Sequence, residues 1–302
     1  MRAVQFSEFG GPEVLQVVEV PEPHAGPRQI RVVVSACGVN PVDWKVRQGY
    51  MGGELPRGMG LEVAGVVDEV GDEVTDVTAG DQVFGPTSNG AADFAVLSNW
   101  AHVPATLDLP GAAALPVAVE TAVRGLDELG VAAGQTLLIN GGAGAVGTVA
   151  AQLAIDRGAR VIVTASQRNA ERLRGYGAEV TGYGEGLSER VRELAGGQDG
   201  VVDRVFDMGP GGALTELVEL AGDPRHVLTI SDMQGAASAG VLTSGGPTSV
   251  RCWDALDHAA TLIEQGKLTL PVQQTFPLDQ VADAERLSQE GHLSGKLVLL
   301  VD

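Results

Sequence analysis

Residues 135–169, QTLLINGGAGAVGTVAAQLAIDRGARVIVTASQRN, decide the fold class. The apolar run 136–139 predicts a buried parallel strand, and the run 160–164 predicts a second one. Between them, Gly142, Gly144 and Gly147 have G-x-G-x-x-G spacing and open a segment whose apolar residues recur at helical intervals. A glycine-rich turn that follows a strand and opens a helix, within about 30 residues, is typical of a dinucleotide-binding βαβ unit.

The same turn predicts which residues face the cofactor. Without side chains the backbone can approach a pyrophosphate, and the start of the helix offers free N–H groups and a favourable dipole. We therefore expect Gly142, Gly144, Ala145, Val146 and Gly147 to bind the cofactor. The alternative is a glycine turn that only packs the helix on the strand.

The residues after the second strand bear on which dinucleotide is bound. NAD-binding proteins usually place an Asp or Glu there, where it bonds the ribose 2′-hydroxyl. This chain has Thr-Ala-Ser-Gln-Arg at 164–168, with no acid. Ser166 can donate a hydrogen bond, and Arg168 suits a 2′-phosphate. We expect NADPH rather than NADH, unless Arg168 is only a solvated residue at the start of a helix.

Composition limits the class of protein. The chain has 302 residues, enough for two domains, and 44% of them are hydrophobic. A formal net charge of −19 argues against nucleic acid and against an anionic membrane as partners. Cys37 and Cys252 form neither a disulfide framework nor a C-x-x-C pattern. With no signal peptide and no long apolar run, we expect a soluble cytoplasmic protein.

The pattern of elements changes along the chain. Residues 1–112 show short strand-like runs bounded by turn residues, whereas strands alternate with helices from about 112 onward. We predict helices at 112–129, 253–266 and 279–289, strands within 201–209, 225–231, 272–276 and 296–301, and glycine-rich loops at 49–60 and 232–249. The predicted class is α/β, with a β-rich domain (1–112, completed by 266–302) and a nucleotide-binding domain (113–265).

Further segments carry a resemblance to a known family: ACGVNPVDWKVRQG (36–49), GLEVAGVVDEVG (60–71), AGDQVFG (79–85), NGAADFAV (89–96) and GHLSGKLVLLV (291–301). With these, nearly the whole chain resembles the zinc-independent medium-chain dehydrogenase/reductase superfamily, in its NADPH quinone oxidoreductase and enone (enoyl) reductase branch. The resemblance implies a GroES-like β domain beside an inserted Rossmann domain with a doubly wound parallel sheet. It also implies an active-site cleft between the domains and a homodimer joined through the Rossmann sheets.

The zinc ligands of other family members are replaced here. Zinc-dependent relatives carry Cys and His in the segment that matches 39–42 and a Gly-His-Glu that matches Gly60-Leu61-Glu62. This chain has Asn40 at the Cys position and Leu61 at the His position. Asn and Leu cannot replace a thiolate and an imidazole as ligands of a catalytic zinc. None of the five histidines has H-E-x-x-H or clustered spacing, so we expect a metal-free protein.

A metal-free member of this family is suited to particular reductions. We expect hydride from NADPH to reach an activated C=C of a small enone or enoyl compound, or a quinone. The resemblance points to Asn40, which can donate to a developing oxyanion or fix the ribose, and to Asp43, which could join Lys45 or Arg47 in a charge network or form a structural turn pair. Tyr50 is the nearest phenol and, like solvent, could supply a proton.

Four more residues are expected near the cofactor. The resemblance places Thr121 at the nicotinamide carboxamide and Tyr183 beside the adenosine phosphate. Asp207 and Ser231 follow predicted strand ends, where ligands bind in open α/β sheets. Two other functions remain open: a zinc-free enzyme like an alcohol dehydrogenase, and a non-catalytic NADPH-binding or sensor protein.

Overall fold

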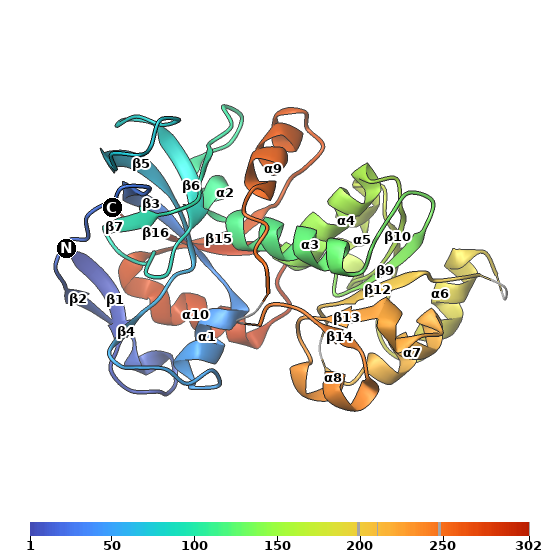
Figure 1. Ribbon diagram of the computed structural model, residues 1–302. Coiled ribbons are helices and arrows are strands. Elements are labelled where there is room, and N and C mark those ends of the chain that lie inside the picture. Colours follow the sequence, from blue (N-terminus) through green and yellow to red (C-terminus); the bar gives the residue numbers. More distant parts are fainter. Residues whose placement is uncertain (198–199, 210, 247–248, 302) are drawn as a thin grey trace. The chain divides into compact units, whose positions relative to one another are not determined.

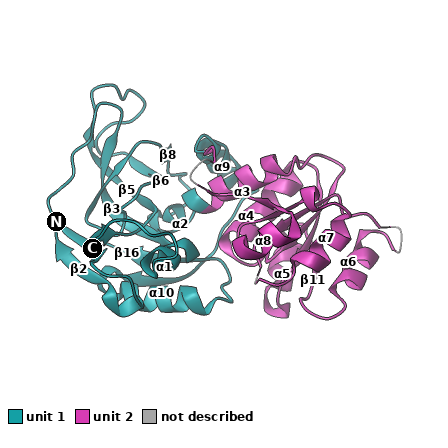
Figure 2. Ribbon diagram, turned by 60° about the horizontal axis from the view of Figure 1, so that its bottom comes forward, with its two compact units in different colours: residues 1–117, 253–302 teal, residues 118–252 magenta. Residues whose placement is uncertain are grey.

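A computed structural model describes residues 1–197, 200–209, 211–246 and 249–301, which divide into two compact units (Figures 1 and 2). Unit 1 comprises Met1–Val117 and Trp253–Asp302, and unit 2 comprises Ala118–Cys252. The sequence boundaries lay at 112/113 and 265/266. Helix α9 (Ala255–Glu264) therefore groups with unit 1, although the expected boundaries placed it with the nucleotide-binding segment.

Unit 2 is built on a parallel sheet of six strands in the order β11-β10-β9-β12-β13-β14. This is the doubly wound order, which confirms the predicted fold class. The strands are β9 (Thr136–Asn140), β10 (Arg160–Thr164), β11 (Glu179–Thr181), β12 (Arg204–Asp207), β13 (Val227–Thr229) and β14 (Leu242–Thr243). The helices are α3 (Pro116–Glu128, which begins in unit 1), α4 (Ala145–Asp156), α5 (Gln167–Gly175), α6 (Leu187–Ala195), α7 (Leu214–Ala221) and α8 (Met233–Ala239). All of β9 is buried, as its apolar run predicted.

Unit 1 is β-rich. A seven-stranded sheet has the order β15-β16-β3-β5-β6-β8, with β7 paired to β3, and a three-stranded sheet has the order β2-β1-β4. The strands are β1 (Arg2–Phe6), β2 (Gln16–Glu19), β3 (Ile30–Val39), β4 (Arg57–Gly58), β5 (Glu62–Val70), β6 (Gln82–Pro86), β7 (Phe94–Leu97), β8 (Ala101–His102), β15 (Val272–Pro277) and β16 (Lys296–Leu300). Its helices are α1 (Pro41–Arg47), α2 (Leu109–Ala113), α9 and α10 (Val281–Glu290).

The C-terminal strand lies between β15 and β3 in this sheet. Strand β16 pairs antiparallel with β3, with Leu297 opposite Val39, and its residues 296–299 are buried. The two strands share one hydrophobic core, in which Leu297 and Leu299 pack with Ile30, Val32 and Val34. The C-terminal segment therefore belongs to unit 1.

Two predicted elements differ from the structure. The single helix expected over 112–129 is divided into α2 and α3, because Pro116 has no backbone N–H and takes the first position of a new helix. The loop predicted over 232–249 contains α8 and the short strand β14, while residues 247–248 lie outside the described residues. Within the described chain, no helix is both long enough and apolar enough to span a membrane.

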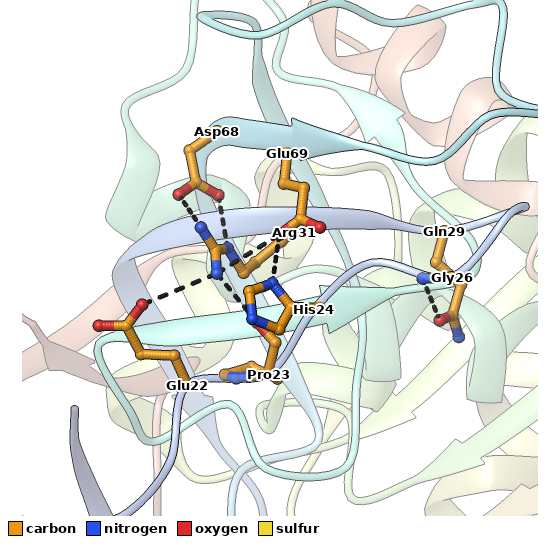
Figure 3. A network of polar contacts seen from close by, with 8 residues as sticks. All are labelled: Glu22, Pro23, His24, Gly26, Gln29, Arg31, Asp68 and Glu69. Carbon is orange, nitrogen blue, oxygen red and sulfur yellow. Dashed lines mark hydrogen bonds and ion pairs between the residues drawn. The ribbon is translucent and has the colours of Figure 1, made fainter.

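A network of charges fastens the segment before β3 to β5 (Figure 3). Arg31 donates to both carboxylate oxygens of Asp68, at 3.0 and 2.8 Å, and to the carbonyl of Pro23. His24 contacts Glu69 at 3.1 Å. The side chains of Arg31 and Asp68 are 13% and 27% exposed, whereas Glu22 and His24 lie at the surface, and we assign this network to loop attachment.

Candidate functional site

The glycine turn of unit 2 has the geometry of a phosphate-binding loop. A Cβ on Gly142 would lie 1.9 Å from Cγ1 of Val163, and one on Gly147 would lie 2.6 Å from the carbonyl oxygen of Gly141, so both positions need glycine for close packing. A Cβ on Gly144 would meet no atom within 4 Å. The middle glycine therefore faces open space, on the side from which a ligand can approach the backbone.

The start of α4 supplies hydrogen-bond donors. Gly144 is the N-cap and has no side chain to cap the helix. The first intrahelical bond runs from the Thr148 N–H to the Gly144 carbonyl at 2.9 Å. The N–H groups of Ala145, Val146 and Gly147 precede it, and N–H groups in a first turn have no partner within the helix. The donor set fits an anionic phosphate.

Arg172 supports this turn from α5 and was not predicted. Its guanidinium donates to the carbonyl of Ala143 at 3.1 Å and to Oγ1 of Thr148 at 3.2 Å. These contacts join α5 to both ends of the glycine turn. The available signal was helical spacing, since Arg172 follows Arg168 by one turn, but spacing alone could not show which of the two faces the turn.

Polar side chains join the ends of four neighbouring strands. Asn140 at the end of β9 donates to Asp207 of β12 at 2.8 Å and accepts from Oγ1 of Thr164 at 2.6 Å. Oδ2 of Asp207 accepts from Thr229 at 2.7 Å and from Ser231 at 3.2 Å. Burial raises the pKa of Asp207, and these hydrogen bonds lower it in part. The structure thus brings Asp207 and Ser231 together at the strand ends, where open α/β sheets bind ligands.

Ser166, Arg168 and Tyr183 lie beyond the ends of β10 and β11. Ser166 is the N-cap of α5 and accepts from Nδ2 of Asn169 at 3.1 Å, while Arg168 is exposed. Burial raises the pKa of the half-exposed Tyr183, and a hydrogen bond with Thr164 lowers it in part. The Arg190 guanidinium donates to the carbonyls of residues 182–185, which fixes the loop that carries Tyr183.

Thr121 lies next to a buried ion pair on α3. Glu120 and Arg124 are 1% and 3% exposed, and Nε of Arg124 donates to Glu120 at 2.7 Å. Arg251 pairs with the other oxygen of Glu120 at 3.3 Å. The hydroxyl of Thr121 lies 3.5 Å from Glu120, at the limit of a hydrogen bond. This cluster escaped prediction, because Glu120 and Arg251 are far apart in sequence.

Unit 1 buries two further candidate residues, Asn40 and Asp43. Nδ2 of Asn40 donates to Oε1 of Glu62 at 2.7 Å, and its Oδ1 accepts from the Lys296 ammonium at 2.6 Å. Its backbone N–H donates to Oδ2 of Asp43 at 2.7 Å. Asn40 is the N-cap residue of α1, and the Asp43 carboxylate belongs to a capping box at this helix start. Burial raises the pKa of Asp43 to about 8.

Two alternatives were open for Asp43, and the structure does not show the first of them, a charge network with Lys45 or Arg47. Arg47 is 1% exposed and pairs instead with the fully buried Glu285 of α10, while Lys45 lies over the ring of Trp44. Asp43, Arg47 and Glu285 line one small cavity. The charge of Arg47 therefore fixes α1 to α10, and Asp43 is left as a separate buried acid.

Tyr50 is placed differently from Asn40 and Asp43. It follows α1 in an exposed turn, and its backbone N–H donates to the Lys45 carbonyl at 3.1 Å. The residue is 73% exposed, whereas Asn40 and Asp43 are 5% and 6% exposed. The structure does not bury the phenol with these two side chains, so its role as a proton donor stays a prediction.

The residues around Asn40 do not fit a zinc ion. A catalytic zinc needs three N, S or O ligands and an open position. Positions 40 and 61 carry Asn and Leu, and the Lys296 ammonium lies between Asn40 and Glu62, where it would repel a dication. Nowhere in the described ranges do three or more His, Cys, Asp or Glu side chains form a group that could hold a metal ion.

Comparisons with known proteins give matches over almost the full length of the chain. Residues 26–123 match the alcohol dehydrogenase GroES-like domain, and residues 177–299 match a family model described as zinc-binding dehydrogenase. The chain is 32% identical to the chloroplastic NADPH-dependent alkenal/one oxidoreductase of Arabidopsis thaliana, over 99% of this chain and 79% of that one. It is 31% identical to the quinone oxidoreductase of Lama guanicoe, over 100% and 98%. The Escherichia coli quinone oxidoreductase complexed with NADPH superposes with a TM-score of 0.83 at 25% identity, covering 99% of this chain and 100% of that one.

Proposed function

This chain belongs to the quinone oxidoreductase and enone reductase branch of the medium-chain dehydrogenase/reductase family, and we propose that it uses NADPH to reduce small molecules without a metal. The acceptor is an activated C=C of an enone or enoyl compound, or a quinone. The glycine turn is the observation that supports this proposal most directly. Gly144 faces open space there, next to the N–H groups at the start of α4 that have no partner within the helix. The donors there fit the pyrophosphate of a dinucleotide.

Different residues bind different parts of the cofactor. Gly142, Gly144 and the N–H groups of 145–147 hold the pyrophosphate, and Arg172 keeps the turn in shape. We assign the 2′-phosphate of NADPH to Ser166 and Arg168, and the adenosine side to Tyr183, in agreement with the NADPH-dependent Arabidopsis relative. Asp207, Ser231 and Thr121 are assigned to the remainder of the cofactor.

Bound NADPH supplies the hydride, and the protein must then stabilise the oxygen on which negative charge develops. We assign this role to Asn40. Its Nδ2 carries two protons, and one is donated to Glu62, so the second can serve the substrate oxygen. Asp43 fixes the backbone of Asn40. Tyr50 or a solvent molecule provides the proton that completes the reduction.

The absence of a zinc-type ligand set favours this reaction over the oxidation of an alcohol. An enone or a quinone already carries the carbonyl that withdraws electrons, whereas an alcohol depends on a group that lowers the pKa of its hydroxyl. We therefore rank an alcohol dehydrogenase-like activity second. A non-catalytic NADPH sensor would share the glycine turn but would turn over no acceptor.

The experiment traces the transferred hydride with a deuterium label. The protein is supplied with NADPH deuterated at the transferred position and a panel of small enones, enoyl compounds and quinones, and the products are analysed by mass. Deuterium on the β-carbon of a saturated ketone supports ene reduction. Cofactor oxidation only by quinones, without a carbon-bound label, supports quinone reduction. Tight binding of NADPH without oxidation by any acceptor contradicts the enzymatic proposal.

We also propose a homodimer that works in the cytoplasm, on the strength of the family resemblance. Light scattering of the purified protein should give twice the mass of the 302-residue chain. A fluorescent fusion expressed in the source cell should be spread through the cytoplasm. A monomeric mass, or a signal confined to an organelle, would contradict the respective part.

A further inference from the structure

Two arginines of unit 2 share one buried glutamate on α3. Glu120 and Arg124 are one helical turn apart, so their side chains are neighbours on one face of the helix. Nε and Nη2 of Arg124 donate to the two carboxylate oxygens of Glu120, at 2.7 and 3.2 Å. Nη1 of Arg251 lies 3.3 Å from Oε2 of the same carboxylate. The cluster therefore holds two positive charges and one negative charge.

The second guanidinium is not needed to balance the carboxylate. Arg124 contacts both oxygens of Glu120, and its Nη1 also donates to the hydroxyl of the buried Ser244, which directly follows β14. Arg124 alone thus neutralises Glu120 and joins α3 to the segment after β14. Among the described residues, neither guanidinium pairs with a second carboxylate. The charge of Arg251, whose side chain is 42% exposed, is therefore in excess.

This excess charge lies close to Thr121. The Thr121 hydroxyl and Nη1 of Arg251 lie 3.5 and 3.3 Å from the same atom, Oε2 of Glu120. Since Glu120 is 1% exposed, its carboxylate is a rigid anchor that holds the Arg251 guanidinium at this place. A ligand group that contacts Thr121 is therefore also close to a positive charge.

The two forms of the cofactor differ in charge at the nicotinamide ring. The ring of NADPH is neutral, and transfer of a hydride ion leaves the ring of NADP⁺ with a positive charge, while the phosphates stay the same. A positive charge beside the ring repels NADP⁺ and exerts no such repulsion on NADPH. Its contribution therefore appears in the ratio of the two affinities, in which the shared phosphates cancel.

We propose that the excess charge of Arg251 makes the site selective for the reduced cofactor, by weakening the binding of NADP⁺ relative to NADPH and so favouring release of the oxidised form. Arg251 is the specificity-determining residue, and Glu120 positions its guanidinium. The inference rests on the proposed function, in which Thr121 contacts the nicotinamide half of the cofactor. It adds a preference between two oxidation states that the cofactor assignment by itself does not contain.

The test compares Kd of NADP⁺ with Kd of NADPH by calorimetry in matched variants. Arg251→Gln removes the excess charge and should lower the ratio of Kd for NADP⁺ to Kd for NADPH about threefold or more. Glu120→Gln removes the negative charge and should raise the same ratio. Arg251→Lys keeps the charge and should keep the ratio. Arg225→Gln, at an exposed arginine before the amino end of β13, should leave it unchanged.

The opposite signs expected for Arg251→Gln and Glu120→Gln distinguish charge from packing, because a general loss of structure would not move the ratio in two directions. A second probe is 2′-phospho-ADP-ribose, which lacks the nicotinamide. In each variant its affinity should change by the same factor as that of NADPH. If Glu120→Gln does not fold, the wild type, Arg251→Gln and Arg251→Lys still decide.

The outcomes separate this inference from the proposed function. A wild type that binds NADPH, together with an unchanged ratio in Arg251→Gln, would overturn the inference and leave the proposed function standing. NADPH binding without turnover of any acceptor would contradict the enzymatic proposal, while a lowered ratio in Arg251→Gln would still support the inference. A wild type that binds no NADPH would contradict both.

Discussion

Nδ2 of Asn140 lies 2.8 Å from Oδ1 of Asp207, and this hydrogen bond joins β9 to β12. These are the two strands at which the strand order of the sheet reverses, the place where open α/β sheets bind ligands. Asp207 is 1% exposed, and it also accepts from Thr229, Ser231 and the Gly209 N–H. One buried carboxylate therefore organises the floor of the proposed cofactor site.

We predict that Asp207→Ala destabilises unit 2 by about 2–4 kcal/mol, because several buried donors lose their acceptor at once. Asp207→Asn keeps one acceptor oxygen and should lose less. Urea denaturation followed by circular dichroism measures both. If the two variants were equally stable, or if neither differed from the wild type, the carboxylate would not hold the strand ends together.

The glycines of the turn should separate cofactor binding from folding. Gly144→Ala adds a methyl group into open space, at an ordinary φ of −71°, so we expect an unchanged Tm and an NADPH Kd raised about tenfold or more. Gly147→Ala forces a Cβ to within 2.6 Å of backbone atoms of the turn, and should cost about 1–3 kcal/mol of stability.

Fluorescence titration with NADPH and thermal unfolding test this pair of variants. The two variants should differ in which quantity changes more. Gly144→Ala should mainly weaken NADPH binding, and Gly147→Ala should mainly lower stability. A Gly144→Ala protein that binds NADPH as the wild type does would show that the cofactor does not approach this backbone.

Features that depend on a short stretch of sequence could be predicted. Features that depend on contacts between distant residues could not. The strand-turn-helix-strand at 136–164 followed from short apolar runs and glycine spacing, and β10 has the predicted bounds. Asp207 and Ser231 could be expected to lie close together because parallel strands present their ends at one edge of a sheet. By contrast, Lys296 meets Asn40 through the register of β16 on β3, which a single sequence does not display.

Two predictions that the structure corrects have identifiable physical causes. The segment from 232 looked like a loop because it is rich in Gly, Ala and Ser, yet Asp232 caps α8 by accepting from the Gly235 N–H at 2.7 Å. The partner of Arg47 was sought among nearby residues, but it is Glu285, on a helix from the other end of the chain. In the first case a helix cap mattered more than the amino-acid composition of the segment. In the second case an ion pair formed between residues far apart in sequence and not between neighbours.

Arg168 and Arg172 should differ in what they do for the cofactor. Arg168 is exposed at the start of α5, and its assigned partner is the 2′-phosphate, so Arg168→Ala should raise the NADPH Kd about tenfold or more and leave NADH unchanged. Arg172 holds the Ala143 carbonyl, so Arg172→Met should weaken both cofactors alike. Parallel titrations with NADPH and NADH separate the two effects. Equal losses for both cofactors in Arg168→Ala would remove it from the 2′-phosphate site.

The buried Asp43 predicts how stability depends on pH. Burial is the main cause that raises its pKa to about 8 in the folded protein, against 3.8 for the free side chain, and the negative charge of Glu285 adds to it. A group with a raised folded pKa stabilises the protein fully below its unfolded pKa, and that contribution is lost as the pH rises through the folded pKa. Between pH 4 and pH 8, Asp43 should therefore make stability fall with rising pH, by at most about 1.4 kcal/mol per pH unit.

Asp43→Asn isolates this effect. Its amide oxygen can still accept the Asn40 N–H, but it has no proton to lose. We expect the variant to be more stable than the wild type at pH 8, and the difference to shrink steadily as the pH is lowered to 5. Urea denaturation of both proteins at four pH values measures that difference, in which the other titrating groups largely cancel. A difference that stays constant across this range would mean that Asp43 ionises normally in the folded protein.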